Sequence, residues 1–173
     1  MKTITTPITQ ADIDGLKAGD MVLVSGYIYT GRDAVLPKIV KLMEEGKLAE
    51  YGIDLEGGVV FHTAVSVAGT GPTSSNKLEI EASIAPLSKG GIRMHMGKGA
   101  LKKETIDAMD KYGSCFAIIP PVTALLESKV SSREVIAFPE EGMEAFHRLY
   151  VHEFPVIIGA VHGKTIDDEE AQA

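Results

Sequence analysis

Residues Gly69–Lys77 (GTGPTSSNK) constrain the local fold more than any other stretch of this chain. Two glycines and a proline fix a sharp turn there, because glycine adopts positive φ and proline presets its own φ. Ser75 or Asn76 can act as the N-cap of a following helix, and Glu79 forms a capping-box pattern with Asn76. Hydroxyls, backbone N–H groups, a helix N-terminus and Lys77 would then face one small volume, which suits a carboxylate or a phosphate. An ordinary Gly-Pro turn that only caps a helix is the alternative.

A second cationic turn follows the apolar, β-prone run Met21–Tyr29, which predicts a buried strand. Apolar residues then recur at helical spacing from Ala34 onward, and Pro37 is compatible with a helix only near its start. We therefore expect a helix from about Asp33. Arg32 would lie where the strand is followed by the helix, which is the edge that faces ligands in α/β domains. A surface arginine paired with Asp33 is the alternative.

The third cationic turn, Gly97-Lys98-Gly99, has the same position relative to its neighbours. The alternating segment Ile92–Met96 predicts a short strand, and helical spacing predicts a helix over Lys102–Tyr112. The turn does not match a P-loop, which requires G-x-x-x-x-G-K-[ST]. A solvated loop lysine is the alternative for Lys98 taken alone.

Other segments predict further strands and one further helix. A helix is expected from about Asn76 to Ala85, because Pro86 disturbs its last turn. Apolar and β-branched runs predict the remaining strands, at Val59–His62, Val135–Phe138, Arg148–Val151 and Val156–Val161. Alternation of strands with helices indicates the α/β class.

The three turns together resemble the beta subunit of class I fumarate hydratases and L-tartrate dehydratases. The segments that carry the resemblance are Ser25–Ala34, Gly71–Ser75, Gly97–Gly99, Gly142–Phe146 and Val151–Pro155. It extends over nearly the whole chain, from about Ile8 to Ile166. The resemblance implies the swivelling β/β/α domain found as the C-terminal domain of class I fumarases. We expect a single domain over residues 1–173, with a core at 8–166 and a frayed acidic tail at 167–173.

The resemblance also implies a reaction and a set of site residues. Members of this family use an iron–sulfur cluster to add water to a small dicarboxylic acid or to remove it. Thr73 is implied as the catalytic residue beside the reacting carbon. The implied substrate-binding residues are Arg32, Gly71, Ser74, Lys77 and Lys98.

Three departures from the family pattern affect the identity of the expected substrate more than the assignment to the family. Lys77 stands where arginine is usual, and lysine keeps the charge but loses the planar two-point fork. Val35-Leu36-Pro37 interrupts the common Arg-Asp-Ala-Ala-His pattern, and Pro120-Pro121 replaces a typical Gly-Gly pair.

Cysteine and histidine content bears on the cluster. Cys115 is the single cysteine and lies in the apolar run Ser114–Ile119, which indicates a core thiol on a buried strand. An iron–sulfur cluster takes several thiolates, so a 4Fe-4S cluster would be carried by a separate alpha subunit and this chain would hold no metal. The five histidines give no ligand pattern and are interpreted as surface or core residues. His62, at the end of an expected strand, could also line the cleft in which the substrate would bind.

Overall composition limits the partners. A net charge of −7 and a pI near 5.2 argue against a nucleic-acid partner. No apolar run approaches the roughly 20 residues of a membrane span, and the N-terminus lacks a signal-peptide core. We therefore expect a cytoplasmic protein with no membrane partner.

These inferences lead to three functional hypotheses. The leading one is the beta subunit of a class I fumarate hydratase, a hydro-lyase that converts fumarate reversibly to L-malate in the tricarboxylic acid cycle. It would be inactive without its alpha subunit, with which it forms a hetero-oligomer. The beta subunit of L-tartrate dehydratase is the alternative enzyme, and a non-catalytic module that binds small anions is the alternative of another class.

Overall fold

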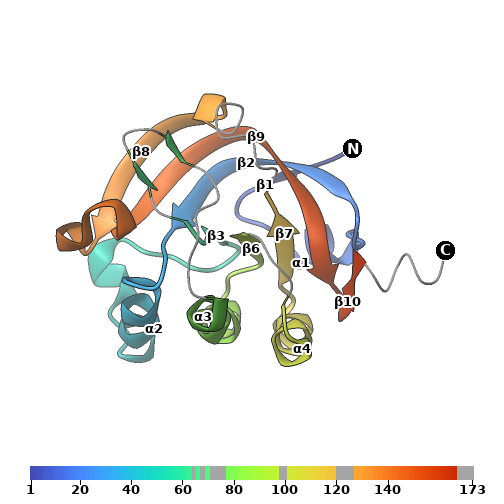
Figure 1. The fold of residues 1–173 in the computed structure, drawn as a ribbon, viewed down its shortest axis with the longest axis horizontal. Helices are drawn as coiled ribbons and strands as arrows, with labels where there is room; N and C mark the ends of the chain where they lie inside the picture. The colour runs from blue at the N-terminus through green and yellow to red at the C-terminus, as the bar shows by residue number, and fades with distance from the viewer. Residues whose placement is uncertain (64, 67–68, 71–76, 98–100, 120–126, 167–173) are drawn as a thin grey trace.

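The computed structural model describes residues 1–63, 65–66, 69–70, 77–97, 101–119 and 127–166, with the backbone alone at 65–66, 69–70 and 77–80 (Figure 1). Helices separate the parallel strands of the large sheet from one another along the chain, so the α/β class predicted from the sequence is confirmed. In chain order the elements, with 3-10 helices written η, are β1 (Lys2–Thr5), α1 (Gln10–Asp14), β2 (Met21–Thr30), α2 (Leu36–Glu44), η1 (Leu48–Tyr51), β3 (Val59–Phe61), β4 (Val65–Ser66), β5 (Gly69–Thr70), α3 (Lys77–Lys89), β6 (Met94–Gly97), α4 (Lys103–Tyr112), β7 (Cys115–Ile118), β8 (Val130–Ala137), η2 (Pro139–Glu144), β9 (Phe146–Val161) and β10 (Lys164–Thr165).

One 8-stranded sheet organises the molecule and closes on itself. β2, β3, β6 and β7 lie side by side and run parallel. β9 runs antiparallel to both β7 and β2, so it joins the two ends of the parallel group into a ring. β1 pairs with β2 outside the ring, and β8 and β10 pair with β9. Figure 1 shows β2 and β9 as long curved strands over the top of the molecule, with α2, α3 and α4 in a row below.

The strand β9 unites two segments that the sequence predicts as separate strands, Arg148–Val151 and Val156–Val161. The chain passes between them through an irregularity, because β2 and β9 change register between Val24 and Gly26. Gly26 has a φ of 112°, and a Cβ there would collide with Oγ1 of Thr6. A bulge of this kind bends a strand and increases its twist, which a sheet needs in order to close.

The helices begin and end at places that the sequence predicts only in part. α2 starts at Leu36 rather than near Asp33, because the preceding residues form a turn in which the carbonyl of Arg32 accepts from N–H of Val35 and Leu36 at 3.1 and 2.9 Å. Pro37 lies in the first turn, where its missing N–H costs little. Within the described ranges, every helix is too short or too polar to cross a lipid bilayer.

The prediction that α3 ends near Ala85 is wrong, because the helix continues through Pro86 to Lys89. A proline inside a helix costs ~3 kcal/mol. Leu87 is fully buried in the core, and burial of a leucine contributes about 1.5–3 kcal/mol. Packing of this last turn therefore offsets the local penalty.

The core is divided by the sheet into an inner and an outer part. Val59 and Phe61 of β3 belong to a cluster drawn from all five ring strands and from α1, whereas Val60 packs with residues of α2 and α3. Successive side chains of a strand point to opposite faces, so both faces of these short strands are buried. This explains the nearly continuous apolar sequence of the parallel strands.

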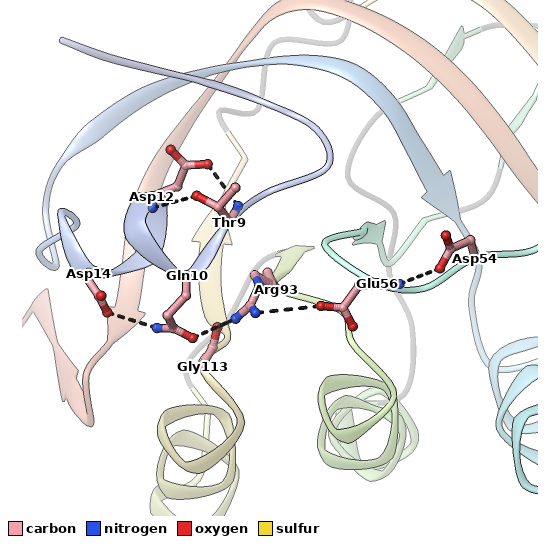
Figure 2. A network of polar contacts seen from close by, with 8 residues as sticks. All are labelled: Thr9, Gln10, Asp12, Asp14, Asp54, Glu56, Arg93 and Gly113. Atoms are coloured by element: carbon pink, nitrogen blue, oxygen red, sulfur yellow. Dashed lines mark hydrogen bonds and ion pairs between the residues drawn. The ribbon is translucent and has the colours of Figure 1, made fainter.

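An arginine network ties together the edge of the sheet at which the parallel strands begin (Figure 2). Nη1 of Arg93, just before β6, donates to Oε1 of Gln10 at 2.8 Å and to the carbonyl of Gly113, just before β7, at 3.2 Å. Nη2 of Arg93 lies 3.8 Å from Oε1 of Glu56, which precedes β3. One side chain thus connects the starts of three strands with α1.

We expect Arg93→Met to lower the free energy of unfolding by roughly 1–3 kcal/mol, because it removes hydrogen bonds from a charged, mostly buried donor. Methionine keeps a long unbranched side chain, so packing changes little. Urea unfolding followed by circular dichroism measures the loss. Lys103→Met is the control: Lys103 forms an exposed ion pair with Asp107 in α4, and its loss should change stability by less than about 0.5 kcal/mol. Equal effects of the two variants would contradict a structural role for the Arg93 network.

Candidate active site at the carboxyl edge of the parallel strands

The carboxyl ends of β2, β3, β6 and β7 meet at one edge, which is opposite the Arg93 network and is called the carboxyl edge below. Backbone hydrogen bonds continue past the strand ends. N–H of Gly31 donates to the carbonyl of Phe61 at 3.1 Å, and N–H of His62 donates to that of Met96 at 2.9 Å. The first residues after β2 and β3 are therefore fixed next to each other. In open α/β sheets this is the edge at which ligands bind.

Of the six site residues that the sequence predicts, Arg32 is the one whose side chain lies in the described part of the chain. Lys77 is the first residue of α3, as the capping pattern predicts, and its backbone alone is described. The others, Gly71, Thr73, Ser74 and Lys98, lie outside the described residues. Lys98 is the next residue in the sequence after Gly97, the last residue of β6.

Arg32 lies in the turn between β2 and α2, as predicted. Its Nε is 3.5 Å from Oε1 of Glu144, the last residue of η2, and the two side chains are 21% and 34% exposed. A guanidinium carries five N–H donors in a planar fork, so contact with one carboxylate is compatible with a two-point contact to another. This arrangement can bind a carboxylate ligand that approaches the carboxyl edge.

Gly31 allows this turn to pack against the start of α2. A Cβ on Gly31 would lie 2.9 Å from Cδ2 of Leu36 and 3.0 Å from Cγ2 of Val35, both of which are buried. Any larger residue would push the turn away from α2. The glycine before Arg32 therefore fixes the position of the arginine.

Two buried polar atoms at the carboxyl edge have no hydrogen-bond partner among the described residues. They are Oγ1 of Thr30, the last residue of β2, and Nδ1 of His62, the first residue after β3. Thr30 and His62 are 0% and 3% exposed, and Thr30 is the register partner of Phe61. Buried polar groups are usually hydrogen-bonded, so these two atoms, at the edge where ligands bind in α/β sheets, are available to a ligand or a partner.

His62 is joined to a second buried histidine. Its Nε2 lies 3.0 Å from Nδ1 of His95 in β6, and Nε2 of His95 lies 2.9 Å from Oγ of Ser88 in α3. Burial lowers the pKa of His62 to about 4, and burial together with the neighbouring His62 lowers the pKa of His95 well below its usual value. Both rings are therefore neutral near pH 7.

The sequence left His62 and His95 as either surface or core residues; both are buried, and their pairing was not predicted. A histidine flanked by buried methionines in the segment Met94-His95-Met96 was the available signal. The pairing depends on the register of β3 against β6, in which Val60 is opposite His95, and no periodicity in the sequence specifies that register.

Cys115 is a buried core thiol in β7, as predicted. Burial raises its pKa to about 12, so it remains protonated and a poor metal ligand. Within the described residues, no group of three or more His, Cys, Asp or Glu side chains is arranged to hold a metal ion.

The fold is that of an α/β domain with an arginine at the carboxyl edge of its parallel strands. The family model of the fumarase C-terminus matches residues 2–168, so this chain belongs to the fumarase C-terminal family. The expected swivelling domain of class I fumarases agrees with this assignment.

Relatives of two kinds support the family. A Methanocaldococcus jannaschii protein named "Putative L(+)-tartrate dehydratase subunit beta" is 30% identical over 177 residues, covering 94% of this chain and 89% of that protein. The L(+)-tartrate dehydratase subunit beta of Escherichia coli is 26% identical, covering 95% of this chain and 86% of that protein. The anaerobic class I fumarate hydratase of Escherichia coli is 27% identical over 142 residues, which are 78% of this chain but only 26% of that protein.

The lowered histidine pKa predicts acid sensitivity. The pKa of His62 is about 4 in the folded chain against an ordinary 6.5, so between these values the unfolded chain binds more protons and acid favours unfolding. This contribution to stability is fully present above pH 6.5 and is lost as the pH falls toward 4. Its size across the whole window is roughly 3 kcal/mol, at about 1.4 kcal/mol per pKa unit.

Urea unfolding at pH 7, 6 and 5 measures this slope. His62→Phe should flatten it, whereas His162→Gln, which changes an exposed histidine after β9, should keep the wild-type slope. The same slope in wild type and His62→Phe would show that the buried ring does not link protonation to unfolding.

Proposed function

We propose that this chain is the beta subunit of a class I fumarate hydratase, which hydrates fumarate reversibly to L-malate. An alpha subunit on a separate chain carries the 4Fe-4S cluster, and the two chains form a cytoplasmic hetero-oligomer. The observation that carries the proposal is the position of Arg32 at the carboxyl edge, next to buried polar groups that have no partner among the described residues. Membership of the fumarase C-terminal family supports it.

The role of this chain is to bind the two carboxylates of the substrate. Arg32 binds one of them, because its planar fork matches a carboxylate. Lys98, which follows β6, and Lys77, which begins α3, bind the other together with Gly71 and Ser74. A dicarboxylate held at both ends presents its central carbons in one orientation, which reduces the entropic barrier to the reaction.

Thr73 is the catalytic residue of this proposal. Its hydroxyl would hold or transfer a proton beside the reacting carbon. The pKa of a free hydroxyl is too high for this role, so Thr73 acts with a carboxylate supplied by the alpha subunit.

The residues of this chain do not fit the cluster itself. Cluster ligands are thiolates, and the one cysteine, Cys115, is buried in β7 with a raised pKa. The cluster therefore belongs to the alpha subunit in this proposal, and this chain supplies substrate contacts.

The beta subunit of L-tartrate dehydratase is the second candidate. The relatives that match this chain over most of their own length, 89% and 86%, carry that name, whereas the anaerobic fumarate hydratase is matched over 26%. Both candidates require the same carboxylate contacts. The substrate distinguishes them.

Co-expression with a cysteine-bearing alpha subunit from the same genome tests the proposal. The two chains should co-purify through a tag on this one, and the brown complex should consume fumarate, followed by ultraviolet absorbance. The chain alone should be colourless and inactive. Dehydration of L-tartrate in preference to hydration of fumarate would favour the second candidate. A complex inactive on both substrates would indicate a non-catalytic anion-binding module. Stoichiometric cluster on this chain alone would contradict the assignment of the cluster to the partner.

In the active complex, Arg32→Ala should raise KM for the dicarboxylate roughly 10- to 150-fold, because it removes a charge-assisted contact worth about 1.5–3 kcal/mol. Arg32→Lys should have an intermediate effect, since it keeps the charge and loses the fork. Arg93→Met is the matched control at the opposite edge: it should lower stability and leave KM unchanged. An unchanged KM in Arg32→Ala, measured by steady-state kinetics, would remove Arg32 from the site.

A further inference from the structure

The buried row Ser88–His95–His62 crosses from α3 through β6 to the carboxyl edge and ends in Nδ1 of His62, which has no partner among the described residues. We propose that His62 is a further substrate-binding residue, whose Nδ1–H donates a hydrogen bond to an oxygen of the bound dicarboxylate. Ser88 and His95 are positioning residues that fix the tautomer of His62. This inference rests on the proposed function, because it takes the dicarboxylate as the ligand.

Hydrogen-bond direction along the row determines what His62 offers. Each neutral imidazole carries one proton, so one nitrogen donates and the other accepts. If the hydroxyl of Ser88 donates to Nε2 of His95, then Nδ1–H of His95 donates to Nε2 of His62, and the proton of His62 is on Nδ1. If the row runs the other way, the Ser88 hydroxyl accepts from His95 and its own proton needs another acceptor.

The direction in which Ser88 donates to His95 gives the Ser88 hydroxyl proton an acceptor. Among the described residues, the one hydrogen bond of the Ser88 hydroxyl is the one to His95, and Ser88 is 2% exposed. A buried hydroxyl proton without an acceptor costs about 1–3 kcal/mol, so the direction in which Ser88 donates is favoured. The group without a partner is then Nδ1–H of His62, which can donate a hydrogen bond to an anionic oxygen.

The position of His62 agrees with this role. Phe61, its neighbour, accepts from N–H of Gly31, the residue before Arg32. On the other side, Cβ of His62 lies 4.0 Å from the point that a Cβ on Gly97 would occupy, and Gly97 precedes Lys98. His62 therefore lies between the turn of Arg32 and Gly97, the last residue of β6.

A neutral donor near the turn of Arg32 has a different effect from a cation. Arg32 and Lys98 supply charge, which attracts any small anion. A single N–H at a fixed place instead selects the orientation of the bound oxygen, because hydrogen bonds weaken steeply away from linear geometry. His62 remains neutral near pH 7 since burial lowers its pKa, so it adds direction without adding charge.

Two variants of His62 distinguish the contact made by Nδ1 from the contact made by Nε2. In His62→Asn the amide nitrogen is two bonds from Cβ, as Nδ1 is in histidine, so the donor to the ligand is kept and the contact with His95 is lost. In His62→Gln the amide group is three bonds from Cβ, as Nε2 is, and its oxygen can accept from Nδ1–H of His95, so the contact with His95 is kept and the donor to the ligand is lost. Each variant is compared with wild type in the complex with the alpha subunit.

We expect His62→Gln to weaken binding of succinate, a non-reacting dicarboxylate, by about 10-fold or more in calorimetry, and to raise KM similarly. His62→Asn should bind succinate more tightly than His62→Gln does. Equal affinities of the two variants, or tighter binding by His62→Gln, would show that the ring only packs against His95 and would overturn the proposal. Melting temperatures identify any unfolded variant.

Long-range ¹H–¹⁵N spectra of the labelled full chain test the tautomer without any activity. The proton of His62 should be on Nδ1; a proton on Nε2 would overturn the assignment as donor. Ser88→Ala should change this tautomer, because the hydroxyl that fixes it is gone. Ser83→Ala, at a buried serine earlier in the same helix, should not. An unchanged tautomer in Ser88→Ala would remove Ser88 as a positioning residue.

The outcomes distinguish the two proposals. A complex that is inactive on fumarate and tartrate but binds succinate in the order predicted contradicts the proposed function and supports His62 as a ligand-binding residue. An active complex in which the two His62 variants bind equally contradicts only the role of His62. A complex that neither reacts nor binds succinate contradicts both.

Discussion

The pairing of β9 with both β7 and β2 is the constraint on which the rest of the structure depends. Through it, four parallel strands that would otherwise form an open, twisting sheet become part of a ring with an apolar interior. The strand ends are then fixed relative to one another on both edges. Such a frame holds the turns that follow different strands at fixed positions, and a shift of about 1 Å in a binding group can cost 100-fold in rate.

Buried polar groups lie at both edges of the ring. At the edge where the parallel strands begin, Arg93 has side-chain and backbone partners that link neighbouring strands, while its Nε and Oγ of Ser114 have no hydrogen-bond partner among the described residues. At the carboxyl edge, Thr30 and His62 each leave a buried atom without a partner in the described part of the chain. Both edges thus contain buried polar atoms without a described partner, and the arginine network that links the strands lies at the edge where the strands begin.

Local sequence signals were sufficient for the turns and insufficient for the long-range pairings. Glycine, proline and helical spacing place Arg32 correctly between a strand and a helix, and an apolar run identifies Cys115 as buried. The continuity of β9 across Pro155 and of α3 through Pro86 could not be predicted, because tertiary packing outweighs the local preference of proline at both places. The contact of His62 with His95 depends on strand register, which joins residues 33 positions apart.

Closure of the sheet also bears on how the chain avoids aggregation. Inside the ring every strand has neighbours on both sides, so its backbone N–H and carbonyl groups offer no template to another molecule. Among the described strands of the large sheet, β1, β8 and β10 lie outside the ring. The longest of them, β8, carries Ser131, Ser132, Arg133 and Glu134 in succession, all exposed, and charged residues on an outer strand discourage intermolecular pairing. The chain is thereby protected against joining copies of itself edge to edge.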